Sequence, residues 1–143
     1  MAGVVGRDSG RAHLEVIDRP SRAELERVVE DHTAPDSVVY TDEWCGYARL
    51  PELDRHHATV CHSPGVRAWA RDDDGDGERE VHCNTLEGLW AGLRTFLRPF
   101  RGVSKWYLSG YVVMFEWGYN LAAVTDELLR GILARMGGTV NTT

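Results

Sequence analysis

The apolar positions at the start of the chain predict a β-hairpin followed by a helix. Two short apolar runs, at residues 3–6 and 12–17, flank the turn-forming residues Asp8, Ser9 and Gly10. Ser21 then precedes Glu24 by three residues, the capping-box pattern that marks a helix start. The apolar stripe of that helix is Leu25, Val28 and Val29.

The middle of the chain predicts a buried strand and a second strand. Residues 38–41 form a continuous apolar run, the kind of strand that is buried on both faces of a sheet. Residues 44–53 favour a short helix and residues 58–61 another strand, which leaves His56 and His57 in a loop. Residues 64–80 are expected to form an irregular acidic loop.

The C-terminal half predicts three helices. The first runs from residue 85 to about 100 and ends at Pro99 and Gly102. Ser104 is expected to cap the second and Thr125 the third. Helical spacing favours a core role over a base-stacking role for the aromatic residues Trp106, Tyr107, Tyr111, Phe115, Trp117 and Tyr119. The element order predicts an α/β fold with a mixed sheet flanked by helices, in a single domain over residues 1–143.

Composition limits the function classes. The chain has a net charge of −6, which argues against tight non-specific binding to nucleic acid. Arg94, Arg98, Arg101 and Lys105 nevertheless form a basic stretch, either a solvated helix surface or a phosphate-facing one. Three cysteines without a paired motif, no signal peptide and no long apolar run indicate a cytoplasmic protein that does not enter a membrane.

Two segments carry candidate chemistry. Asp42 follows the buried strand, where open α/β sheets place ligands, but it could equally cap the next helix. Glu87 lies in the first turn of the helix at residues 85–100, and Asn84 with Glu87 also matches a plain capping box. Arg94, seven residues after Glu87, shares its helix face and could bind a phosphate or lie exposed.

Two other metal patterns are weaker. The acidic run at 72–78 begins like an EF-hand loop, but position 12 is Cys83 instead of glutamate, so a solvated loop is favoured. The pairs at 61–62 and 82–83 each join a cysteine to a histidine. Adjacent strand residues point to opposite faces, so each pair would supply at most one zinc ligand.

Taken together, these strings resemble a bacterial insertion-sequence transposase of the DDE type, in the ISXO-like group. The matching strings are VYTDEWCGY at residues 39–47, CHS at 61–63, VHCNTLEGLWAGLR at 81–94 and FLRPFRGVSKWYLSGYVVMFEWGYN at 96–120. The resemblance implies a ribonuclease H-like catalytic domain that cleaves DNA at transposon ends and transfers the strand to target DNA. It also implies Mg²⁺, with Mn²⁺ as an alternative, and a transposase homo-oligomer.

The resemblance also implies roles for individual residues. Asp42 would be the second acidic metal ligand and Glu87 the third, with Asn84 and Arg94 completing the catalytic signature. His62 matches a recurring family histidine without an assigned role. The family's first catalytic Asp lies on a first strand that precedes the segment matching Ala2 onward. The expectation is therefore a truncated, catalytically incomplete domain, or else a non-catalytic module that associates with full-length transposase and inhibits it.

Overall fold

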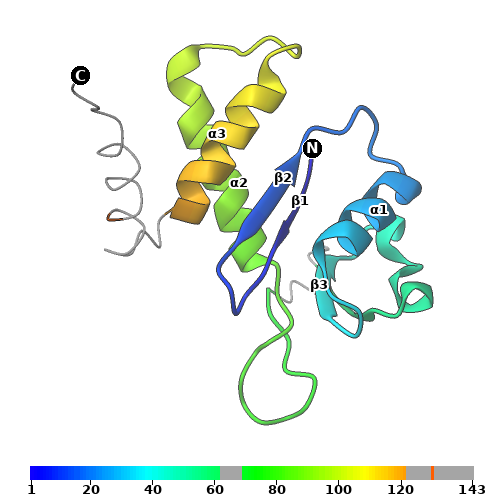
Figure 1. Cartoon of the computed structure of the whole chain (residues 1–143). Coiled ribbons are helices and arrows are strands. Elements are labelled where there is room, and N and C mark those ends of the chain that lie inside the picture. The colour runs from blue at the N-terminus through cyan, green and yellow to red at the C-terminus, as the bar shows by residue number, and fades with distance from the viewer. Residues whose placement is uncertain (62–68, 122–129, 131–143) are drawn as a thin grey trace, which may run out of the picture.

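The computed structural model describes residues 1–61, 69–121 and 130. Two predicted features, His62 and the helix capped by Thr125, fall on residues outside this part of the chain, apart from residue 130. The elements that precede them are shown in Figure 1.

The predicted hairpin is confirmed. Strand β1 (Ala2–Val5) pairs antiparallel with β2 (Ala12–Glu15), and Val5 lies opposite Ala12. The turn between them contains Gly10 at a φ of 65°, a left-handed conformation that suits glycine. Helix α1 (Arg22–His32) follows, and the Ser21 side chain accepts a hydrogen bond from the Glu24 backbone N–H at 3.3 Å, as the capping pattern predicted.

A separate parallel pair forms the second half of the sheet structure. Strand β3 (Val38–Asp42) pairs with β4 (His56–Val60) in register from Val38 opposite His56. The short helix expected between them consists instead of two 3-10 turns, η1 (Cys45–Tyr47) and η2 (Leu50–Leu53). The prediction that His56 and His57 lie in a loop is wrong, because both belong to β4.

The predicted long helix is α2 (Asn84–Leu97), which continues into the 3-10 turn η3 (Arg98–Phe100). Helix α3 (Leu108–Asn120) starts three residues later than the predicted cap at Ser104 implies, because its N-cap is Tyr107. Residues 105–107 form a turn instead, in which the Tyr107 N–H donates to the Ser104 carbonyl at 2.9 Å.

The hairpin separates two hydrophobic clusters, because successive strand residues point to opposite faces. Helices α2 and α3 cover one face, with Leu89, Leu93 and Val112 packed against β2. Helix α1 covers the other, with Leu25 and Val28 against Ala2. Figure 1 shows the hairpin between these helices. The described fold is thus mixed α/β, with two small sheets and helices on both sides.

The prediction that the aromatic residues of the 106–119 segment are all core is only partly right. Tyr111, Phe115 and Tyr119 are partly buried, and Phe115 and Tyr119 pack against the α2–α3 cluster. Trp106, Tyr107 and Trp117 are exposed, at 78%, 71% and 66%. Trp106 and Tyr107 precede the helix, so helical spacing does not govern them, and Trp117 lies on the outer face of α3. None of the described helices is long and apolar enough to cross a membrane.

Candidate functional site at the carboxyl end of β3

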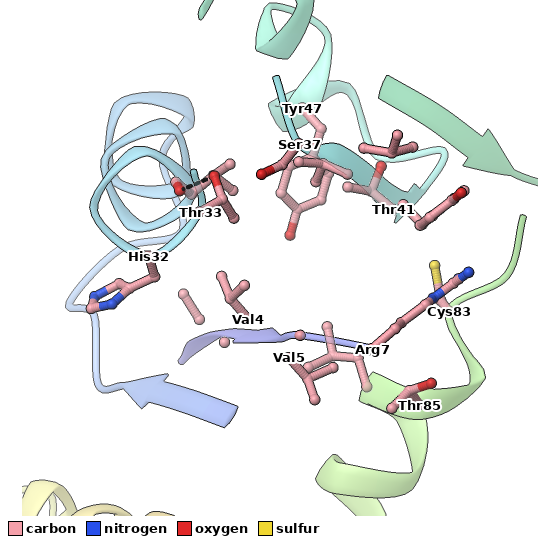
Figure 2. Close-up of a pocket in the computed structure, with 18 of the residues that line it drawn as sticks. Val4, Val5, Arg7, His32, Thr33, Ser37, Thr41, Tyr47, Cys83 and Thr85 are labelled. Atoms are coloured by element: carbon pink, nitrogen blue, oxygen red, sulfur yellow. Dashed lines mark hydrogen bonds between the residues drawn. The ribbon is translucent and has the colours of Figure 1, made fainter. Parts of the chain in front are cut away.

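A cavity of about 930 Å³ lies between β1 and β3. It is lined by both strands, by the end of α1 and by the first turns of α2. Figure 2 shows Val4 and Val5 of β1 across the open space from Ser37, Thr41 and Tyr47, with Arg7 and Cys83 at one end. The cavity therefore brings together side chains from the two sequence segments with candidate chemistry.

Asp42 is the last residue of β3 and lines this cavity. Its Oδ1 accepts a hydrogen bond from the Trp44 backbone N–H at 3.2 Å, a local turn of the kind that aspartate favours. The residue is exposed. Asp42 is not the N-cap of the 3-10 turn that follows. That position is held by Trp44, whose side chain makes no capping hydrogen bond.

Glu87 lines the same cavity from the first turn of α2. The capping-box interpretation of Asn84 and Glu87 is wrong. The N-cap is Cys83, one residue earlier, and no side chain caps the helix there. The Glu87 N–H donates to the Cys83 carbonyl at 3.0 Å, so Asn84 already lies inside the first turn. Capping therefore does not account for these two polar side chains.

Cys83 shows that the two carboxylates share one electrostatic environment. Burial raises the pKa of its thiol, and the negative charges of Asp42 and Glu87 raise it further, to about 11. Arg7 acts in the opposite direction. Tyr47, another cavity residue, has its pKa raised by burial and by Asp42. A cation bound near Asp42 and Glu87 would therefore change the pKa values of Cys83 and Tyr47.

Arg7 lies at the same end of the cavity. Its guanidinium stands 3.8 Å from the centre of the Tyr40 ring on β3. It also donates to the backbone carbonyl of His82 at 2.6 Å and to that of Glu80. Arg7 therefore ties the hairpin to β3 and to the segment before α2, and no described carboxylate forms an ion pair with it.

The other predicted site residues lie outside the cavity lining. Asn84 and Arg94 are both exposed on α2, in its first and last turns. Val38 is 51% exposed, so the prediction that the strand at 38–41 is buried on both faces is wrong. Among the described strands, β3 pairs with β4 alone, and its other edge borders the cavity.

The acidic loop forms a separate cluster. Oxygens of Asp72, Asp74 and Glu80 lie within 4.8 Å of one another, and within the described ranges no other set of three His, Cys, Asp or Glu side chains is this close. Asp72 also accepts bonds from the N–H groups of Gly75 and Gly77. Exposed acidic clusters are common, so this proximity alone assigns no role. Within the described ranges, no set of three potential metal ligands this close together includes Cys83.

The sequence profile of the ISXO2-like transposase domain matches residues 1–120. The chain belongs to this insertion-sequence transposase family. An uncharacterized transposase-like protein from Haemophilus influenzae is 22% identical over 118 residues, which cover 82% of this chain and 88% of that protein. The family resemblance drawn from the sequence is thereby confirmed. Its DDE members act on DNA and generally use divalent metal ions.

A second relative places this domain in a longer chain. An uncharacterized protein in the transposable element ISH50 of Halobacterium salinarum is 30% identical over 114 residues. Those residues make up 77% of this chain but only 35% of that protein. No solved structure matches the chain significantly.

Proposed function

We propose that the chain is part of a ribonuclease H-like DDE transposase domain in which Asp42 and Glu87 bind a divalent cation, Mg²⁺ or Mn²⁺. The observation that carries the proposal is that these carboxylates, from β3 and α2, line one cavity and both raise the pKa of Cys83. The order of hairpin, helix, parallel strand pair and helix is consistent with that fold. The reaction would be cleavage at transposon ends and transfer to target DNA.

The carboxylates of Asp42 and Glu87 are the type of ligand that such a cation prefers. Mg²⁺ is commonly bound by one or two carboxylates together with water and substrate phosphates. When bound, it would neutralise charge that develops on the phosphoryl group. Asn84 lies beside Glu87 at the amino end of α2, where backbone N–H groups favour anions, and would orient a phosphate. Arg94 would hold the DNA backbone.

Metal titration tests this proposal directly. Calorimetric titration with MnCl₂ should show a site that weakens at least tenfold in Asp42→Asn and in Glu87→Gln. Asp18→Asn and Glu30→Gln are matched controls, because both residues are exposed and neither lines the cavity. The titration is repeated in Asp74→Asn to remove binding by the acidic loop. Unchanged affinity in both cavity variants would reject the metal assignment.

The 143-residue polypeptide alone is proposed to have little or no activity. The family's first Asp matches no residue of this sequence, and displacement of a reacting group by 1 Å already lowers rates on the order of 100-fold. Mn²⁺-dependent strand transfer with duplexes of the element's terminal sequence is therefore expected to be undetectable. Activity that disappears in Asp42→Ala would overturn this part of the proposal.

A DNA-contacting surface is proposed around η3. Arg94, Arg98, Arg101 and Lys105 are all exposed, and residues 88–115 contain no Asp or Glu. None of the four forms an ion pair with a described carboxylate. Each phosphate contact adds about 0.9 to the slope of log affinity against log salt. The double variant Arg98→Gln, Arg101→Gln should therefore lower that slope by about 2 in anisotropy measurements, whereas the α1 control Arg22→Gln should not.

The second candidate function is association with a transposase chain, and the cavity between β1 and β3 favours it. In the part of the chain that the structure describes, both strands leave an edge unpaired there. Co-purification of the chain with a full-length transposase of its element would support this function. A chain that stays monomeric beside that transposase at every concentration would count against it.

A further inference from the structure

Two neighbouring aromatic side chains before α3 are directed to solvent. Trp106 and Tyr107 are the most exposed of the large hydrophobic side chains in the described part of the chain. Both belong to the turn at 105–107, in which the Tyr107 N–H donates to the Ser104 carbonyl. Neither ring belongs to the two described core clusters. Adjacent exposed apolar side chains that are rimmed by charge mark a binding surface.

The loop that carries these rings is positively charged. Arg98 is the first residue of η3, Arg101 is its C-cap, and Lys105 directly precedes the two aromatic residues. All three cations are exposed. The Lys105 Nζ stands 4.7 Å from the centre of the Trp106 ring. Cations and aromatic rings at one place are complementary to the phosphates and the bases of a nucleic acid.

Packing holds η3 against the first turn of α3. The Phe100 ring meets the Tyr111 ring edge-on, with their centres 4.6 Å apart. Tyr111 lies one turn after the N-cap residue Tyr107, and its N–H donates to the Tyr107 carbonyl at 3.4 Å. The cations of η3 and the exposed rings therefore lie at the same end of the helix pair, where Figure 1 shows the loop that joins α2 and α3.

The exposed rings distinguish single-stranded from double-stranded DNA as the ligand. In a duplex each base is stacked between its neighbours, so a ring on the protein surface meets only the backbone and the base edges. An unpaired base offers its face. Aromatic side chains that stack on bases beside a basic surface are the common feature of single-strand binding. Trp106 and Tyr107 therefore favour unpaired nucleotides.

We propose that the loop between α2 and α3 binds unpaired nucleotides of a DNA strand, with bases stacked on Trp106 and Tyr107 and phosphates bound by Arg98 and Arg101. The inference rests on the DNA-contacting surface proposed around η3, names its ligand and requires no metal. Glu87 precedes Arg98 by three turns of helix, about 16 Å. A strand that reached both sites would span about five nucleotides at about 3.4 Å each.

The test measures binding of a fluorescent oligothymidine of about 12 nucleotides to the whole chain by anisotropy. Trp106→Ala should weaken binding at least about fivefold, because loss of a stacked ring costs this much per base. The loss should persist as salt is raised, since stacking releases no counterions. Trp117→Ala is the matched control. It removes another exposed tryptophan, on the outer face of α3, and should leave the affinity unchanged.

An abasic strand of the same length separates stacking from charge. It keeps every phosphate but offers no base, so the unaltered chain should bind it more weakly than oligothymidine. Trp106→Ala should bind the abasic strand as the unaltered chain does. Trp106→Phe keeps a ring and should recover most of the affinity for oligothymidine. An equal loss in Trp106→Ala on both strands, or no loss on oligothymidine, would overturn the proposal.

The double variant Arg98→Gln, Arg101→Gln separates failure of this inference from failure of the DNA surface. It should lower the salt slope on oligothymidine by about 1.4, because each single-strand phosphate contact adds about 0.7. A lowered slope with normal binding by Trp106→Ala would reject the stacking alone. An unchanged slope, or no binding of oligothymidine, would reject both. If Trp106→Ala abolished self-association in sedimentation velocity but not DNA binding, the rings would belong to a protein contact and the inference would be wrong.

Discussion

The Asn120 side chain bonds to Ala12 as a neighbouring strand would. Its Oδ1 accepts from the Ala12 N–H and its Nδ2 donates to the Ala12 carbonyl, both at 2.8 Å. One turn earlier on α3, Glu116 accepts a bond from the Leu14 N–H at 2.6 Å. Helix α3 thus covers the outer edge of the hairpin, because its side chains take the place of a further strand there.

Removal of the Asn120 amide should therefore destabilise the chain. Asn120→Ala leaves both Ala12 backbone groups without their partner, and an unsatisfied buried polar group costs about 1–3 kcal/mol. Urea denaturation should show a loss of this size. Ser109→Ala, at an exposed position on the same helix, is the control and should change stability little. Equal losses in the two variants would show that the bond to Ala12 contributes nothing specific.

The acidity of Cys83 reports on the candidate metal ligands without any metal present. Because burial and the charges of Asp42 and Glu87 raise its pKa to about 11, iodoacetamide should alkylate Cys83 more slowly than the exposed Cys45. Asp42→Asn and Glu87→Gln should each lower that pKa and speed the reaction, as measured by mass spectrometry over a pH series. Asp18→Asn should not. An unchanged rate in both variants would mean that the carboxylates do not converge on this thiol.

Arg55 connects the end of α1 to β4. It is 8% exposed and donates to the Thr33 hydroxyl at 2.8 Å, the Thr33 carbonyl at 3.0 Å and the Leu53 carbonyl at 2.9 Å. Arg55→Met keeps the apolar stem but loses every bond, so a loss of about 2–3 kcal/mol in the free energy of unfolding is expected. Arg55→Lys should restore only part of it, because an ammonium lacks the planar fork. Full stability in Arg55→Lys would contradict this.

Local patterns predicted the hairpin, α1, α2 and the existence of the strands β3 and β4, because those elements depend on short-range signals. The Ser21 cap and the turn at Gly10 are examples. Long-range pairing could not be predicted. No periodicity indicates that Asn120 bonds to Ala12 or that Arg55 bonds to Thr33, since these bonds join residues far apart in the chain.

For the candidate site, the strand-end position of Asp42 and the first-turn position of Glu87 could be predicted from sequence. The surroundings could not. From the sequence, Cys83 was considered only as a candidate ligand in weak metal patterns. In the structure its thiol is partly buried, and the charges of Asp42 and Glu87 act on it. No sequence pattern singled out Arg7, and its stacking on Tyr40 depends on how the hairpin packs against β3. The assignment of metal ligands remains a prediction.

The pH dependence of stability should depend on His57. Burial lowers the pKa of its imidazole, which lies 2.7 Å from the Thr41 hydroxyl on the neighbouring strand. The unfolded chain protonates this histidine near its ordinary pKa of about 6.5, so the folded form disfavours the added proton. Its contribution to stability is therefore complete above about pH 6.5 and is lost as pH falls through the lower folded pKa.

Urea midpoints measured from about pH 8 to 5 should therefore decline below about pH 6.5, before most carboxylates titrate. His57→Gln should flatten that decline. The pKa of His82 is also lowered, by burial first and by Arg7 second, so His82→Gln is measured in parallel to separate the two contributions. The exposed His56 provides the control, and His56→Gln should leave the slope unchanged. A wild-type slope in His57→Gln would mean that the imidazole titrates alike in the folded and unfolded chains.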